Sequence, residues 1–184
     1  MNRLRIAPIL GLWMLAGAGL GATVILPASL GELAAGAQTI VHGRVVAIEP
    51  RWVEGRRQIE TLVTLHADEY LKGALGAELT FKVPGGQLGP YRSVMVGAPT
   101  FQEGDEIVVF LNAQGPSVPW ISGLNQGVFR VAADASGVKV VVPGVPLAAG
   151  GEAQIVRGDP ARRRVGLQAF TEQVKALVRD GRAR

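Results

Sequence analysis

The sequence predicts a mainly β protein, a small barrel or sandwich of seven to eight short strands, with a short N-terminal helix and a C-terminal helix. Three observations lead to this class. Short segments rich in β-branched residues recur between residues 39 and 143, and several alternate apolar with polar residues. Turn-forming stretches such as "NAQGPS", "GLNQ" and "DASG" separate them. An apolar repeat at helical spacing follows near the C-terminus.

The chain begins with the pattern of a secretory signal peptide, which we assign to residues 1–22. Arg3 and Arg5 precede an uncharged apolar run, and small residues follow it. Cleavage after Ala22 is favoured over an earlier site after "AGA", because "TVILPASL" is typical of the start of a mature chain. We therefore expect an exported protein, either periplasmic or extracellular.

The alternative is an N-terminal helix that stays in the membrane as an anchor. No charged residue lies between Ile6 and Gly31, so the uncharged stretch is long enough to span a bilayer. Several glycines dilute this stretch and Pro27 interrupts its end, which leaves a strongly apolar part that is short for a span. We expect membrane contact only if this segment is retained.

Composition excludes several classes of function. The chain has 19 Lys and Arg against 15 Asp and Glu, and loss of Arg3 and Arg5 with the leader leaves 17 against 15, a balance of +2. The high pI therefore does not indicate a nucleic-acid-binding protein. With no cysteine, the chain has no disulfide, no thiolate ligand for zinc, no thiol nucleophile and no lipobox cysteine. About 160 residues can bury a core of adequate size without disulfides.

The first elements after the leader are a helix and two strands. Ser29 and Glu32 have the spacing of a capping box, which predicts a short helix. Residues 39–49 predict the first strand and residues 59–73 the second. In the second strand, alternate residues that begin at Ile59 are expected to face the core.

The remaining strands are short. Residues 77–83 and 91–97 alternate apolar and polar side chains, and each predicts a strand. Residues 103–112 predict a turn followed by a strand buried on both faces, because the strand is almost continuously apolar. Further strands are expected at "PWISG", "QGVFRVAAD" and "VKVVVPG".

These elements divide the mature chain into three parts. Residues 23–143 form the β domain, and residues 144–160 form a Gly- and Ala-rich linker or loop. Residues 161–184 form the C-terminal helix, whose apolar stripe is expected to pack on the barrel because an isolated helix of this length is marginally stable.

Two loops resemble ligand-binding motifs without meeting their requirements. In "PGGQLG" the glycines at positions 85, 86 and 89 have the wrong spacing for a dinucleotide fingerprint, and a strand follows them instead of a helix. We therefore predict a hairpin turn. The acidic "EGDE" lacks the alternating ligands of a calcium loop and is common turn chemistry. We expect no metal and no cofactor.

The candidate binding surface combines the first hairpin loop with the glycine-rich turn. Arginines beside a tryptophan suit the recognition of peptides, glycans or anions. A bare glycine backbone allows a partner to approach closely. The alternative for Trp52 is that it folds over the barrel mouth as part of the core. The candidate residues are Arg51, Trp52, Arg56, Arg57, Gly85 and Gly86.

No local motif predicts catalysis. Both histidines, His42 and His66, lie inside predicted strands, and no serine lies in a "GxSxG" elbow. A hydrolase could still assemble carboxylates from separate strands. The candidates for that alternative are Glu60, Asp68 and Glu69, with His66 close to them in the sequence.

Two phrases carry a resemblance to a family. The first is "LGELAAGAQTIVHGRVVAIEPRW" followed by "IETLVTLHADEYLKG", and the second is "GGQLG", "GAPTFQEGDEIVVFL" and "SGLNQGVFRV" in that order. Over about residues 30–143 these phrases resemble uncharacterised exported bacterial β-barrel proteins. A more distant resemblance is to the OB-like barrel of tissue inhibitors of metalloproteinases and other netrin-type modules. It implies an OB-like barrel. The inhibitors' N-terminal cysteine, which chelates zinc, has no counterpart here.

The sequence thus supports three hypotheses. The leading one is an exported, non-catalytic interaction module of the cell envelope, whose partner is a protein or another envelope component. The first alternative is the hydrolase described above. The second is a purely structural envelope protein.

Overall fold

The computed structural model describes residues 28–53, 55, 57–113, 116–143 and 165–182. Its elements in chain order are α1 (Leu30–Gly36), β1 (Thr39–Val53), β2 (Gln58–Lys72), β3 (Glu78–Pro84), β4 (Gly86–Leu88), β5 (Tyr91–Ser93), β6 (Glu106–Asn112), β7 (Trp120–Ile121), the 3₁₀ helix η1 (Leu124–Gly127), β8 (Val128–Ala133), β9 (Lys139–Pro143), β10 (Val165–Gly166) and α2 (Leu167–Arg182). The protein is therefore mainly β, with one helix near each end of the described chain.

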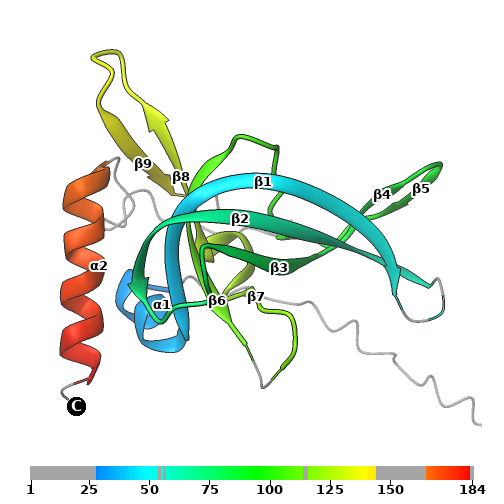
Figure 1. The fold of residues 1–184 in the computed structure, drawn as a ribbon, viewed down its shortest axis with the longest axis horizontal. Helices are drawn as coiled ribbons and strands as arrows, with labels where there is room; N and C mark the ends of the chain where they lie inside the picture. Colours follow the sequence, from blue (N-terminus) through cyan, green and yellow to red (C-terminus); the bar gives the residue numbers. More distant parts are fainter. Residues whose placement is uncertain (1–27, 54, 56, 114–115, 144–164, 183–184) are drawn as a thin grey trace, which may run out of the picture.

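Five strands close into a small OB-like barrel. Their order is β1-β2-β3-β7-β6, and β6 pairs again with β1, so the first and last strands of this set are neighbours. All these pairings are antiparallel except β3 with β7, which is parallel and joins Lys82 to Trp120. The sheet continues past β6 through β8, β9 and β10, while β4 and β5 form a separate hairpin. Figure 1 shows that hairpin projecting from one end of the barrel, with β1 arching across the whole structure.

The long β1 strand bends, which allows it to pair with both β2 and β6 and so to close the barrel. Its ladder with β2 contains register shifts, including one between His42 and Gly43. A Cβ atom at Gly43 would lie 2.2 Å from the carbonyl oxygen of His66 on β2. Only glycine allows the two backbones to approach this closely, and bulges of this kind bend and twist a strand.

Strand β6 separates two hydrophobic clusters. Val108 and Phe110 belong to the cluster that also contains residues of α1 and α2, whereas Ile107, Val109 and Leu111 belong to the cluster inside the barrel. All five residues are completely buried. The prediction that this strand is buried on both faces is therefore confirmed. The same strand contributes side chains to both hydrophobic clusters.

Both helices cover one side of the barrel. Ser29 and Glu32 form the predicted capping box at α1. The α2 helix contributes Phe170, Val174 and Val178 to the outer cluster, and the Phe170 ring lies 4.8 Å from that of Phe129 on β8. The C-terminal helix is thus docked, as its apolar stripe predicted, and Figure 1 shows it standing beside α1, β8 and β9. No helix among the described residues is long and apolar enough to cross a membrane.

The structure corrects the prediction between β3 and β6. Residues 91–97 were expected to form one strand, but the strand ends at Ser93 because only Tyr91–Ser93 has a partner, β4. The "PGGQLG" stretch does form a hairpin, yet it supplies β4 itself and turns at Gly89 and Pro90. The structure contains ten strands in the described residues, and the additional ones are only two or three residues long. The leader and the linker lie outside those residues.

We predict that Phe170→Ala lowers the free energy of unfolding by about 3–5 kcal/mol, because it removes a buried ring and leaves a cavity between the helix and the barrel. Urea denaturation followed by circular dichroism measures this change. The exposed neighbour Gln173 provides the control, and Gln173→Ala should change stability by less than about 0.5 kcal/mol. Equal stabilities of the two variants would show that the helix contributes nothing to the core.

Candidate functional site

A cleft of about 710 Å³ opens beside the end of the barrel from which the β4–β5 hairpin projects. The ends of β1 and β3, the start of β2, the β7 strand and the segment after β5 form its walls. Most of its lining is apolar. The lining residues are Val53, Gln58, Ile59, Glu60, Lys82, Pro84, Gly85, Ser93, Val94, Met95, Val96, Pro99, Trp120, Ile121 and Leu124.

Three consecutive apolar side chains on the cleft wall face solvent. Val94, Met95 and Val96 are 71%, 49% and 66% exposed. We call Val94–Val96 the apolar segment. Single exposed apolar residues are ordinary, but a contiguous apolar patch next to a cleft is typical of an interaction site.

The backbone of the apolar segment is also largely open. Among the described residues it makes one hydrogen bond to another backbone group, in which the Met95 carbonyl accepts from the amide of Ala98 at 3.1 Å. That bond closes a β-turn with Val96 and Gly97 at its centre. The flanking residues are anchored: Ser93 pairs with Gly86, and the Gly97 carbonyl accepts from the Asn125 amide. The segment is therefore held at both ends, while its own amides make no backbone hydrogen bond to another described residue.

The cleft carries one positive charge without a carboxylate beside it. Lys82 is half-buried, and no described carboxylate lies within ion-pair distance of its ammonium group. Glu60, the acidic residue in the lining, accepts hydrogen bonds from Arg51, including one from Nε at 2.8 Å. Arg51 thus neutralises Glu60, and the balance in the cleft is positive.

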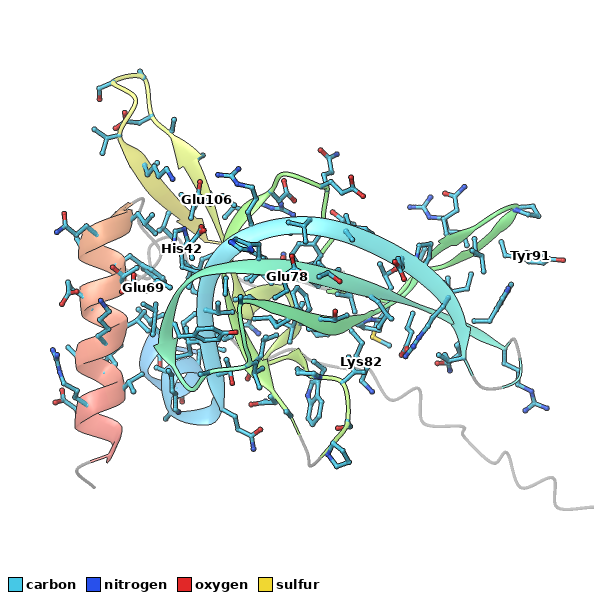
Figure 2. The ribbon with its side chains drawn as sticks, in the orientation of Figure 1. His42, Glu69, Glu78, Lys82, Tyr91 and Glu106 are labelled. Carbon is cyan, nitrogen blue, oxygen red and sulfur yellow. The ribbon has the colours of Figure 1, made fainter. Side chains whose placement is uncertain are left out.

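The predicted hairpin-loop surface lies next to this cleft. Trp52 is half-buried and makes an edge-to-face contact with Tyr91 of β5, with ring centroids 5.3 Å apart. It belongs to neither hydrophobic cluster, so it does not plug the barrel core. Arg57 is exposed, whereas Arg56 lies outside the described residues. Figure 2 shows Tyr91 on the projecting hairpin, far from His42 and Glu69.

The two predicted glycines have different surroundings from those expected. A Cβ at Gly86 would lie 2.5 Å from Thr61 Oγ1, and one at Gly85 would lie 2.9 Å from the Ser93 carbonyl oxygen. Their missing side chains therefore leave room for β2 and β5 of the same chain. Gly85 still borders the cleft through its backbone.

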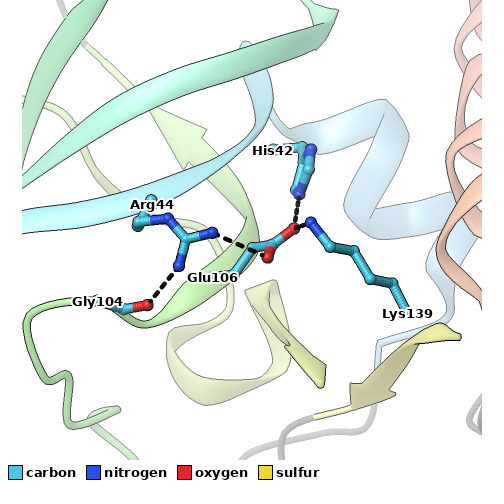
Figure 3. A network of polar contacts seen from close by, with 5 residues as sticks. All are labelled: His42, Arg44, Gly104, Glu106 and Lys139. Carbon is cyan, nitrogen blue, oxygen red and sulfur yellow. Dashed lines mark hydrogen bonds and ion pairs between the residues drawn. The ribbon is translucent and has the colours of Figure 1, made fainter. Parts of the chain in front are cut away.

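A second group of polar residues lies at the opposite end of the barrel. The Glu106 carboxylate contacts His42 Nε2 and Lys139 Nζ, each at 2.8 Å from Oε1, and Arg44 at 3.3 Å from Oε2. Arg44 also donates to the Gly104 carbonyl. We call His42, Arg44, Glu106 and Lys139 the polar network, which Figure 3 shows joining β1, β6 and β9.

The polar network keeps Glu106 ionised. Burial acts to raise the pKa of this carboxyl group, but the hydrogen bonds from Lys139 and His42 outweigh it, so the pKa lies below its ordinary value. A carboxylate oxygen of Asp68, a ring nitrogen of His42 and a carboxylate oxygen of Glu106 lie within 4.8 Å of one another, so these three residues could hold a cation. A cation there would face the Lys139 ammonium and the Arg44 guanidinium on the same carboxylate. That repulsion favours a structural network over a metal site.

The residues proposed for a hydrolase do not gather at one place. Glu60 lies beside the cleft and pairs with Arg51, whereas Asp68 lies near the polar network, eight residues or roughly 26 Å further along β2. Glu69 binds Lys175 of α2 at 2.7 Å. His66 is exposed.

The sequence analysis missed the residues that line the cleft most prominently. The apolar segment was assigned to a strand because "YRSVMV" alternates, and Lys82 was simply the polar position of β3. The available signal was three consecutive apolar residues, which strict alternation on a half-buried strand does not produce.

The chain matches no protein-family model, no curated protein and no solved structure. The cleft and the polar network are therefore interpreted from their own geometry.

We predict that Glu106→Gln lowers the free energy of unfolding at pH 7 by about 1–3 kcal/mol, because it leaves the buried His42 and two cations without their carboxylate. The folded-state pKa of Glu106 lies below the unfolded value. Its contribution is therefore complete above the unfolded pKa, near pH 4–5, and is lost as pH falls through the folded pKa. The difference between wild type and variant should consequently shrink below about pH 4.

Urea titrations at several pH values test this prediction. Glu103→Gln is the matched control, because Glu103 is exposed in the adjoining turn and should give a change below about 0.5 kcal/mol. A difference for Glu106→Gln that stays constant from pH 7 to pH 3 would contradict the proposed electrostatic role.

Proposed function

We propose that this protein is an exported, non-catalytic interaction module of the cell envelope, which holds a partner in the cleft beside the apolar segment. One observation carries the proposal. Three consecutive apolar side chains are 49–71% exposed on the wall of a concave site, next to a half-buried lysine. Covering such a patch with a partner removes apolar area from water, and each buried valine contributes about 1 kcal/mol or more.

The scaffold around the cleft supports a binding role. The closed barrel fixes β2, β3 and β7, and the Trp52–Tyr91 contact attaches the projecting hairpin to the end of β1. Binding sites are commonly built in this way, from loops held by a rigid sheet. The barrel therefore presents the apolar segment in one arrangement, which lowers the entropy lost when a partner binds.

The chemistry of the cleft favours binding over catalysis. Among its described lining residues the only carboxylate is that of Glu60, which Arg51 neutralises, and no histidine stands beside Ser93 to activate it. Export itself rests on the leader pattern of residues 1–22 and on the resemblance to exported barrel proteins. A core that needs no disulfide is consistent with either a periplasmic or an extracellular location.

We predict that a photo-crosslinking residue at Val96 captures a partner in the envelope fraction of cells that produce the protein. The control position is Val138, which is 55% exposed on the β8–β9 hairpin, at the other end of the barrel. Adduct yield at Val96 should exceed that at Val138 by roughly tenfold, because only Val96 borders the cleft. Gel mobility and mass spectrometry of the adducts give the measurement.

The double variant Val94→Ser, Val96→Ser should reduce recovery of the same partner by roughly tenfold or more, because two apolar contacts are lost. Val138→Ser should leave recovery unchanged. Equal adduct yields at the two crosslinking positions would remove the basis for a binding role of the cleft.

A further inference from the structure

We infer that the partner is an extended peptide segment, which lies along the apolar segment as an added strand and places an acidic side chain against Lys82. This inference rests on the proposed function, because it names the class of partner for the same cleft. Three features of the described residues carry it: the open backbone of the apolar segment, the apolar walls facing it, and the unbalanced charge of Lys82.

The backbone is the first feature. The amides of Val94, Met95 and Val96 and the carbonyls of Val94 and Val96 make no backbone hydrogen bond within the described chain. The segment continues directly from β5 and then turns at Val96 and Gly97, where the Met95 carbonyl accepts from the Ala98 amide, so only Val94 and Met95 prolong the strand direction. An extended peptide can pair with the backbone of β5 and Val94 by strand addition, in which main-chain hydrogen bonds supply much of the affinity.

The side chains are the second feature. Successive side chains of an extended peptide point to opposite faces, so every second one would enter the cleft. The lining also contains the half-buried Val53 and Trp120, which offer apolar surface to these side chains. A peptide with apolar residues at alternate positions therefore fits the cleft better than a uniformly polar one.

The charge is the third feature. Lys82 stands in the lining without a described carboxylate partner, whereas Glu60, the only acidic residue among the described lining residues, is already paired with Arg51. Arg57 and Arg92 are exposed on the adjoining hairpins and add positive charge to this end of the protein. A carboxylate of the peptide next to Lys82 would form a charge-assisted hydrogen bond in a half-buried setting.

An acyl chain with a carboxylate shares the apolar and anionic character of this ligand. It has no amide groups, so it would leave the open backbone of the apolar segment unsatisfied when it covers that segment. Burying a polar backbone group without a partner costs free energy. The geometry therefore favours a peptide over a lipid, and the experiment below separates the two.

Selection from a displayed library of random twelve-residue peptides tests the inference. On the wild-type protein we expect enrichment of sequences that alternate apolar residues and contain Asp or Glu. On Lys82→Glu we expect the acidic residue to be replaced by Lys or Arg. A synthetic peptide from the wild-type selection should bind Lys82→Glu at least about tenfold more weakly, because attraction becomes repulsion. Arg179→Glu, an exposed charge reversal on α2, should leave its affinity unchanged.

Backbone methylation of the same peptide tests the strand geometry. Only alternate amides of an added strand point toward its neighbour, so N-methylation in one register should weaken binding at least about tenfold, and methylation in the other register much less. No acidic enrichment, no loss on Lys82→Glu, or equal effects in both methylation registers would overturn the inference.

The crosslinking experiment distinguishes this failure from failure of the proposed function. Capture of a lipid at Val96 would leave the cleft as a binding site but would overturn the peptide assignment. Capture of nothing above the Val138 control would remove the proposed function itself, whatever the selected peptides show.

Discussion

The pairing of β1 with β6 is the constraint on which the rest of the structure depends. It joins residues far apart in the chain, since Arg44 and Glu106, which face each other across it, are 62 positions apart. Closing so long a loop costs conformational entropy, and the buried apolar side chains of both strands offset that cost. Once the pair forms, β1 is held by β2 on its other edge, and the five strands become a ring with two separate cores.

The two ends of the barrel differ in how their polar and apolar side chains are covered. At one end the polar network joins β1, β6 and β9, and α2 covers the adjoining cluster with Phe170, Val174 and Val178. Its ionised groups partner one another, and a carboxylate with three cationic or polar donors has little capacity left for a ligand. At the other end the strands extend past the hydrophobic core. There the apolar segment, which lies between β5 and β6, exposes its side chains to solvent. The cleft and the exposed apolar segment therefore lie at the second end, where we propose that the partner binds.

Much of the fold followed from local patterns. The capping box at Ser29, the alternation in β2 and β3, and the double-sided apolar run of β6 each depend on neighbouring residues only, so the sequence predicted them. The ends of strands were harder to predict. The sequence does not show where the strand that begins at Tyr91 ends, because whether residues 94–96 find a partner depends on β4, which is only three residues long. The site was missed for the same reason. The positions of Lys82, Trp120 and Val96 around one cleft are set by tertiary contacts between distant segments.

An exposed apolar segment with open backbone groups is also a risk for aggregation, and its surroundings indicate how that risk is limited. Unpaired strand edges invite self-association, and proteins commonly protect them with positive charge and proline. Here Lys82 and Pro99 belong to the lining of the cleft, and Arg57 and Arg92 are exposed on the adjoining hairpins. A second copy of this chain would bring the same positive charges to the same place, and like charges repel. A segment that supplies negative charge instead relieves the repulsion. In the proposed complex, the positive charge that discourages self-association is therefore also the charge that would select an acidic partner.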